Sequence, residues 1–194
     1  MSKVIDSTAA EALIRRTESQ KRFTHSVSVG LTNVRLNHKF GEHLDDEELY
    51  VCGLLHDICR EWDAERLFSY VKEHSVPLED EEWEATALLH GPVAADMLRG
   101  EGYPEELCTA VRWHTLGSVG MGRMGLIVFI SDYLEPLRTH ITDEQRGALL
   151  AHDSLEGVAL ALLELQDAYF ASKNRKNARV TDELEAWLRA GKRL

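Results

Sequence analysis

Four histidines and two aspartates occupy apolar stretches of the sequence, where their side chains are expected to be buried. They are His25, His56, Asp57, His90, His114 and Asp132. His56 and Asp57 are adjacent in V-C-G-L-L-H-D-I-C, residues 51–59, and Asp132 interrupts L-I-V-F-I-S-D-Y-L, residues 126–134. A buried carboxylate is unfavourable unless a cation or hydrogen-bond donors compensate its charge. Neither run contains Lys or Arg, so metal ions are the natural counter-charge.

The types of these side chains indicate which metals they suit and how many. Imidazole and carboxylate without thiolate suit iron, manganese or zinc. Six ligands exceed what one catalytic metal takes while it keeps a position open for water, so two metals that share a bridging carboxylate fit better. By subtraction, the ligands stand 31, 33, 24 and 18 residues apart. This spacing places them on separate helices, as in metal sites built inside helical bundles.

Each of the four histidines also has an ordinary interpretation when it is taken alone. A histidine at the end of an apolar helical stripe is usually a satisfied core or surface residue, and only the joint pattern with two buried acids favours a metal site. The other five histidines stand in polar or terminal contexts and are interpreted as ordinary residues. They are His38, His43, His74, His140 and His152.

Apolar residues recur at helical spacing along most of the chain, without strand-like alternation, and predict an all-α protein of about ten helices. Two candidate ligands end apolar stripes, His90 in the stripe that starts at Trp83 and His114 in the stripe that starts at Leu107. Residues 116–125 are rich in Gly and Met and predict a loop, of the kind that often borders an active site. Helices are expected over residues 6–20, 21–40, 45–58, 63–74, 83–90, 92–100, 104–114, 126–134, 142–151, 153–172 and 181–190.

The length of 194 residues suits one domain with a substantial core. We expect a single domain over residues 1–194, with its core at 20–175 and a C-terminal helix at 181–190 capped by Thr181. No apolar run reaches the roughly 20 residues that a membrane span needs, and no secretory signal is apparent. These features predict a cytoplasmic protein that is not bound to a membrane. The three cysteines (Cys52, Cys59 and Cys108) fit reduced core residues better than disulfides.

The formal net charge of −11 limits the partners of the protein. Such a surface repels a polyanion, so binding of nucleic acid is not expected. A small anionic substrate is still compatible, provided that metals and a few arginines create one positive pocket. The sequence leaves the oligomeric state open, with a homodimer as one alternative.

The order H…HD…H…H…D in an all-helical chain is similar to that of the HD-domain superfamily of metal-dependent phosphohydrolases. More narrowly, five segments resemble the bacterial YqeK family, in order and over about residues 20–175. They are R-F-T-H (22–25), G-L-L-H-D-I-C-R-E (53–61), L-L-H-G-P-V (88–93), R-W-H-T (112–115) and I-S-D-Y-L-E-P-L-R (130–138). Members of that family hydrolyse diadenosine tetraphosphate symmetrically to two ADP and use a di-iron centre.

The resemblance implies a single HD-domain helical bundle, a symmetrical bis(5'-nucleosyl)-tetraphosphatase, with two metal ions. Iron is the metal that the resemblance favours, and manganese or zinc are the alternatives. It further implies that one metal is held by His25, His56, Asp57 and Asp132 and the other by Asp57, His90 and His114, with Asp57 as the bridge. Relatives often carry Lys where this chain has Arg60, which keeps the charge but does not deprotonate. A nearby histidine or a water would then serve if a general acid is needed.

The expected nucleophile is a hydroxide between the two metals, because the metals lower the pKa of a shared water and neutralise charge on the attacked phosphate. Asp57 and Arg60 are the candidate catalytic residues. The candidates to contact the nucleotide substrate are Arg22, Arg60, Thr115, Gly117, Arg123 and Arg138. For the arginines, solvated surface charge is the alternative.

Two other functions fit the same sequence. The first is an HD phosphohydrolase that acts on another nucleotide, such as a monophosphate or a hyperphosphorylated guanosine nucleotide. The second is a non-catalytic nucleotide-binding regulatory module, linked to NAD biosynthesis. The second is disfavoured because none of the six ligands is missing from the sequence.

Overall fold

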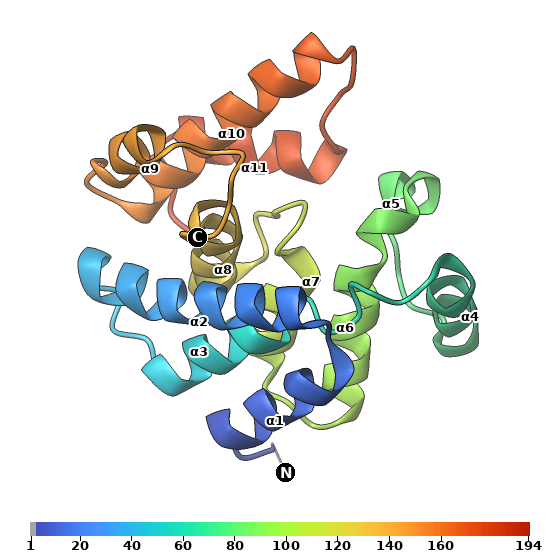
Figure 1. Ribbon diagram of the computed structural model, residues 1–194. Helices are drawn as coiled ribbons and strands as arrows, with labels where there is room; N and C mark the ends of the chain where they lie inside the picture. Colours follow the sequence, from blue (N-terminus) through green and yellow to red (C-terminus); the bar gives the residue numbers. More distant parts are fainter. Residues whose placement is uncertain (1–2) are drawn as a thin grey trace.

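The computed structural model describes residues 3–194, and within this range every regular element is helical, as the sequence predicts (Figure 1). The elements are α1 (Ser7–Thr17), α2 (Gln20–Phe40), α3 (Asp46–Leu55), α4 (Ala64–His74), α5 (Asp80–Glu84), the 3-10 helix η1 (Thr86–Leu88), α6 (His90–Gly100), α7 (Glu105–Trp113), α8 (Gly122–Leu134), α9 (Asp143–Leu150), α10 (Leu155–Ser172) and α11 (Arg179–Arg189). None of these helices combines the length and the apolarity that crossing a membrane requires.

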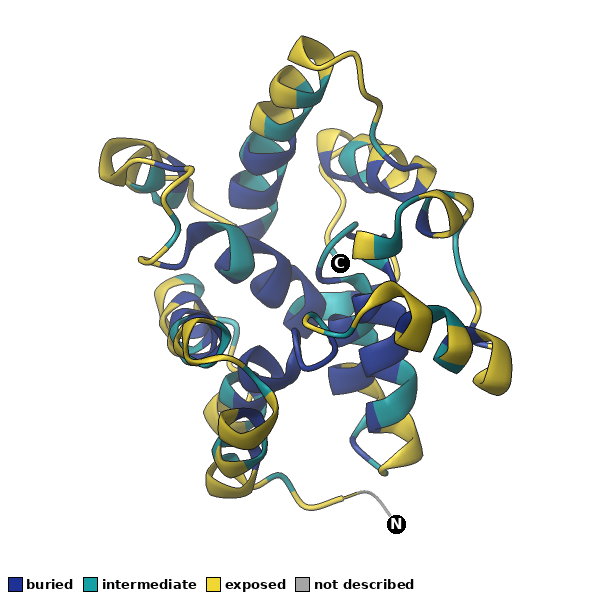
Figure 2. Ribbon diagram, turned by 45° about the vertical axis from the view of Figure 1, so that its right-hand side comes forward, coloured by how far each residue is buried: buried dark blue, intermediate teal, exposed yellow. Residues whose placement is uncertain are grey.

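The helices that carry the candidate ligands meet in the middle of the molecule. Helix α8 is buried along most of its length and packs against α2, α7 and α10. Buried residues concentrate at this meeting point, while exposed residues cover the outer ends of the helices (Figure 2). The run 51–59 is buried throughout, as its composition predicts. The three cysteines are free and buried, which agrees with the predicted reduced core residues.

A close contact between two glycines sets how near α2 lies to α3. The two backbones approach each other with no side chain between them. A Cβ atom added at Gly53 would lie 2.4 Å from the Cα atom and 2.5 Å from the backbone nitrogen of Gly30. Beside this contact, the Asn33 side chain donates a hydrogen bond to the Leu49 carbonyl across the two helices. This close crossing brings the His25 turn of α2 beside the end of α3, where the His56-Asp57 doublet follows.

Several helices begin and end where polar residues and glycine predict. The Asp6 side chain accepts a hydrogen bond from the backbone N–H of Ala9 and caps α1, and Asp45 caps α3 in the same way. Gly41 ends α2 with a φ of +64°, a conformation that glycine adopts without strain. These caps confirm the predicted starts of α1 and α3 and the predicted end of α2.

Other helix boundaries differ from the prediction. Helix α3 ends at Leu55 rather than near Ile58, and residues 56–61 form a succession of tight turns. Helix α8 begins at Gly122, so that the predicted loop at 116–125 is shorter. The predicted helix over 83–90 is wrong. The chain there is divided between α5 and η1 by an extended Ala85, and half of the Trp83 surface is exposed.

Two further corrections concern the starts of α6 and α11. Helix α6 begins at His90, two residues before the Pro92 that was expected to open it. The expected cap Thr181 lies inside α11, which begins at Arg179. The Thr181 hydroxyl instead donates a hydrogen bond of 2.7 Å to the Leu116 carbonyl. This bond ties the C-terminal helix to the loop that follows α7.

Candidate metal centre

The structure brings the six candidate ligands together, although they come from five segments of the chain. His25 belongs to α2, the His56-Asp57 doublet follows α3, His90 starts α6, His114 follows α7 and Asp132 belongs to α8. The Asp57 carboxylate lies between the histidines. Its Oδ2 is 3.6 Å from His25 Nε2 and 3.5 Å from His56 Nε2, while its Oδ1 is 3.1 Å from His90 Nε2 and 3.6 Å from His114 Nε2. The two oxygens of one carboxylate therefore face two different pairs of histidines.

Asp132 completes the half of the cluster that contains His25 and His56. Its Oδ1 lies 3.0 Å from His25 Nε2 and 3.6 Å from His56 Nε2. In the other half, the Nε2 atoms of His90 and His114 are 3.0 Å apart. Ligand atoms with such separations can share one cation, because metal–nitrogen and metal–oxygen bonds are roughly 2.0–2.2 Å long.

Three of the four rings are oriented by a carbonyl three residues earlier in the chain. In each case Nδ1 lies 2.7 Å from that oxygen, for His56 with Gly53, His90 with Ala87 and His114 with Val111. A carbonyl only accepts, so these contacts place the ring hydrogen on Nδ1 and leave the Nε2 lone pair directed at the cluster. The fourth ring, that of His25, has its Nδ1 3.1 Å from Oε1 of Glu135.

The arrangement fits metal ions on its own geometry. The Nε2 atoms of His25 and His56 are buried and meet no hydrogen-bond partner within the described part of the chain. Buried nitrogen atoms of this kind are normally satisfied. Neutral imidazole nitrogens that converge on two carboxylates are the ligand set of a metal site, and a bound cation would satisfy both orphaned atoms.

The two aspartates are anionic in this environment. Burial by itself would raise the pKa of the Asp57 and Asp132 carboxyls. The imidazoles that face these carboxylates, first of all His56 at Asp57 and His25 at Asp132, instead hold both pKa values well below the usual range. Burial lowers the pKa of His90, so that this ring stays neutral near pH 7. Anionic carboxylates and a neutral imidazole are the forms that bind a cation.

Two of the predicted substrate contacts lie directly at the cluster. The Arg22 guanidinium pairs with Asp57, and that of Arg138 pairs with Asp132. A third, Thr115, has its hydroxyl 3.0 Å from His114 Nε2. These three residues surround the cluster with two positive charges and a hydroxyl group.

The other three predicted contacts are engaged elsewhere. Arg60 donates a hydrogen bond of 3.1 Å to the Ala87 carbonyl, the same oxygen that orients His90. The Gly117 N–H is used by a hydrogen bond of 2.8 Å to the Trp113 carbonyl. Arg123 forms half-buried ion pairs with two glutamates, Glu42 and Glu156. The structure therefore does not bring Gly117 or Arg123 to the cluster, and it gives Arg60 a contact with the backbone that orients a ligand.

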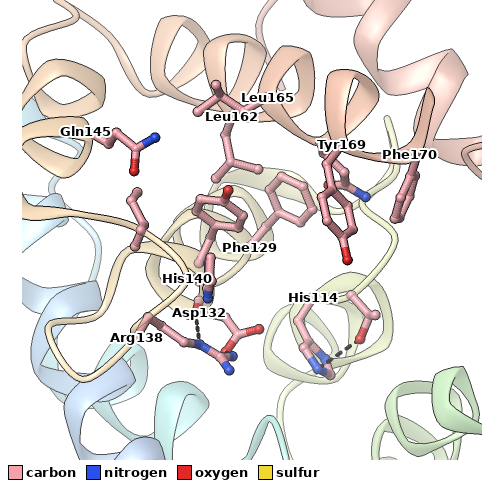
Figure 3. A pocket seen from close by; sticks show the side chains of 14 residues that line it. His114, Phe129, Asp132, Arg138, His140, Gln145, Leu162, Leu165, Tyr169 and Phe170 are labelled. Atoms are coloured by element: carbon pink, nitrogen blue, oxygen red, sulfur yellow. Dashed lines mark hydrogen bonds and ion pairs between the residues drawn. The ribbon is translucent and has the colours of Figure 1, made fainter. Parts of the chain in front are cut away.

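A cavity of about 610 Å³ adjoins the cluster (Figure 3). Its floor includes His114, Thr115 and Asp132, and the opposite wall is formed by α10. The side chains that α10 contributes are mostly apolar or aromatic, namely Leu162, Leu165, Gln166, Tyr169 and Phe170. A mostly apolar pocket with a few converging polar groups is typical of a small-molecule site.

A second cavity, of about 770 Å³, lies on the other side of Arg138 and His140, which line both. Its lining is more polar and includes Lys21, Arg22 and Thr139. The positive groups around the cluster therefore lie between an apolar cavity and a polar one. Such a layout can accept a ligand with a negative centre and a flat apolar end.

Sequence reasoning missed two residues of this region. Glu135 was not singled out, and His140 was interpreted only as an ordinary residue. Glu135 is buried against His25, and His140 lines both cavities. The signal available for Glu135 was its position three residues after Asp132, directly after the last residue of α8.

Comparisons with known proteins agree with this geometry. The family model of the HD domain matches residues 22–137. A protein from Staphylococcus aureus, named symmetrical bis(5'-nucleosyl)-tetraphosphatase, is 30% identical over 67% of this chain and 66% of its own. A protein of the same name from Bacillus subtilis is 26% identical over 86% and 88%. A crystal structure from Clostridium acetobutylicum, described as a predicted HD superfamily hydrolase involved in NAD metabolism, superposes with a TM-score of 0.85, 23% identity and coverage of 98% and 100%.

Proposed function

The chain belongs to the HD domain family, and from this premise we propose that it hydrolyses diadenosine tetraphosphate symmetrically to two molecules of ADP. The observation that carries the proposal is the bridging position of Asp57, whose two oxygens face two pairs of histidines. The names of the relatives from Staphylococcus aureus and Bacillus subtilis support the substrate. The reaction adds one water molecule across the central phosphoanhydride bond, and each half leaves with two phosphates.

We further propose that the cluster binds two metal ions, with iron favoured over manganese and zinc. His25, His56 and Asp132 would hold one ion, His90 and His114 the other, and Asp57 both. When bound, such ions supply Lewis-acid stabilisation of phosphate charge and activation of a water.

The side chains around the cluster have distinct parts in this proposal. Arg22 and Arg138 would exchange their aspartate partners for phosphate oxygens of the substrate, because guanidinium groups bind phosphate in the same bidentate manner as carboxylate. The Thr115 hydroxyl lies close enough to His114 to donate to a phosphate oxygen beside it. An ADP phosphate is a stable leaving group at neutral pH, so the need for a general acid is small, and Arg60 does not have to release a proton.

The two cavities suit the two ends of such a substrate. An adenine ring would lie in the apolar cavity against the aromatic residues of α10, since aromatic side chains stack on bases. The second nucleoside would extend into the polar cavity beyond Arg138. The four phosphates would then cross the positive region between the two cavities.

Product analysis tests this proposal. Purified protein loaded with iron or manganese should convert diadenosine tetraphosphate to ADP alone, and metal analysis should give about two ions per chain. ATP together with AMP would contradict symmetric cleavage. A loaded protein that turns over other nucleotides and leaves this one intact would overturn the choice of substrate.

A pair of histidine variants links the activity to the cluster. His56→Gln should remove activity and reduce metal content, because the buried Nε2 of His56 is one of the atoms that converge on the Asp57 and Asp132 carboxylates. His152→Gln, at an exposed histidine, is the matched control and should leave both unchanged. Equal activity of the two variants would contradict a role of the cluster in the reaction.

A further inference from the structure

The four cluster histidines are not held alike. Backbone carbonyls accept from the Nδ1 of His56, His90 and His114, each at 2.7 Å. The Nδ1 of His25 instead faces a charged acceptor, Oε1 of Glu135, at 3.1 Å. A carboxylate carries a full negative charge, whereas a carbonyl carries only a dipole. One ring of the cluster therefore has a second carboxylate behind it, on the side away from the cluster.

The Glu135 carboxylate is itself firmly placed. The residue is 1% exposed and ends α8, three residues after Asp132. Its second oxygen, Oε2, accepts a hydrogen bond of 2.7 Å from the Leu137 backbone N–H. Both oxygens of this carboxylate therefore lie within hydrogen-bond distance of fixed partners. A fixed anion that only accepts keeps the ring hydrogen of His25 on Nδ1 and its lone pair on Nε2.

We propose that Glu135 is a positioning residue for the His25 half of the metal centre and makes the affinities of the two metal positions unequal. A carboxylate hydrogen-bonded to a metal-ligating histidine fixes its tautomer and increases its strength as a ligand. Among the four histidines, Glu135 contacts His25 alone, and its other charged neighbour, Arg138 at 3.9 Å, pairs with Asp132 of the same half. The position formed by His25, His56 and Asp132 therefore binds its ion more tightly than the position formed by His90 and His114. This inference rests on the proposed metal centre but not on the identity of the substrate.

Stepwise metal titration of Glu135→Gln tests the inference. Metal is first removed with chelator, and cobalt(II) is then added while calorimetry and the visible absorption of the ion are followed. The parent protein should bind two ions with distinct affinities. In Glu135→Gln the tighter affinity should fall by about 10- to 100-fold, while the weaker one stays within about twofold. An unchanged tight affinity, or an equal loss at both positions, would overturn the inference.

A double-variant cycle shows whether Glu135 acts through His25. If it does, adding Glu135→Gln to His25→Gln should cause no further loss of metal affinity, since the ring that the carboxylate orients is already absent. Additive losses would contradict this route and indicate a general structural role. Glu135→Asp keeps the charge but shortens the side chain, and should show a smaller loss at the same position. If Glu135→Gln does not fold, the metal titration of Glu135→Asp serves as the test.

A matched control separates this effect from the loss of any buried carboxylate. Glu42 is half-buried and also ion-paired, but with Arg123, away from the cluster. Glu42→Gln should lower the stability of the fold while it leaves both metal affinities unchanged. A parent protein that binds no metal at all would contradict the proposed function itself, whereas two ions bound equally well by parent and Glu135→Gln would contradict only the present inference.

Discussion

At the level of single residues, the feature that identifies this site in the sequence is a charged side chain inside an apolar run. Asp57 and Asp132 interrupt long apolar runs without a basic neighbour in the run, and this alone requires a cation from elsewhere in the fold. The structure brings Asp57 within 3.6 Å of all four histidines and Asp132 within 3.6 Å of His25 and His56. The type of residue and its surroundings were therefore sufficient to select these six side chains.

The residues that sequence reasoning missed lack this signal. Glu135 precedes a proline at the end of α8, where an acidic residue normally remains in solvent. Only the tertiary structure shows that His25 lies against it. Arg123 is the opposite case, because an arginine in a Gly-rich loop resembles a phosphate ligand until the structure shows its two glutamate partners. Partners that are distant in sequence decide the role of a charged side chain.

Glu18 gives a prediction about the pH dependence of stability. Burial raises the pKa of its carboxyl to about 7, and within residues 3–194 only the Ser26 hydroxyl donates to it. Between the ordinary pKa of 4.5 and about 7, the folded protein holds a proton that the unfolded chain has released. The free energy of unfolding therefore falls as pH rises through this window. Glu18→Gln should remove this part of the decrease in the free energy of unfolding. The variant should therefore be more stable than the parent at pH 8.

Denaturant titrations of both proteins at pH 5 and pH 8 measure this difference. They are run with chelator, so that cations bound near Asp57 do not alter the titration of Glu18. Other titrating groups contribute equally to parent and variant, and the difference in slope isolates Glu18. Identical slopes would contradict the prediction.

At the scale of whole elements, the existence of helices was predictable and several of their ends were not. Asp6, Asp45 and Gly41 mark boundaries by local chemistry, and the structure agrees with them. The end of α3 has another cause. The His56 ring donates to the Gly53 carbonyl, which is the acceptor that the next helical N–H would use. A hydrogen bond from the His56 side chain thus takes the place of a helical backbone hydrogen bond. The hydrophobic periodicity of the sequence gives no sign of this exchange.

The contact between Gly30 and Gly53 gives a prediction about α2 and α3. A methyl group at position 53 meets backbone atoms of Gly30 at 2.4 and 2.5 Å, and backbone cannot turn aside as a flexible side chain can. We expect Gly53→Ala to lower the free energy of unfolding by about 3 kcal/mol or more, at the upper end of the usual effect of overpacking. The variant should also bind metal more weakly, because the spread helices move His25 away from His56.

Gly147→Ala is the control for this prediction. Gly147 lies inside α9, and a Cβ atom there meets nothing within 4 Å. Alanine favours a helix by roughly 0.5–1 kcal/mol over glycine, so this variant should be slightly more stable than the parent. Thermal unfolding of the two variants compares them directly. Destabilisation of similar size in both would show that the close crossing is not the cause.

For the molecule as a whole, the net charge and the charge of the proposed substrate have the same sign. The net charge of −11 repels a tetraphosphate at long range, while Arg22 and Arg138 attract it only near the cluster. Raising the ionic strength from about 0.01 M to about 0.15 M shortens the Debye length from roughly 30 Å to roughly 8 Å and screens the distant charges first. We expect kcat/KM for diadenosine tetraphosphate to rise over this range.

Steady-state rates in sodium chloride and in choline chloride check this expectation. An equal rise of kcat/KM in both salts would indicate screening of the protein's charge, because sodium and choline ions differ in how they bind to specific sites. A steep fall of kcat/KM with either salt would instead mean that the local arginines dominate the approach of the substrate.

The backbone contact between α2 and α3 also constrains how this protein can evolve. Main-chain atoms fix the spacing on the His25 and His56 side, so gradual substitution cannot adjust it. The facing wall of the apolar cavity is made of exchangeable side chains on α10, beyond residues 22–137 that match the family model. Divergence in the proposed nucleoside specificity should therefore accumulate on α10, while descendants inherit the cluster of histidines and aspartates unaltered.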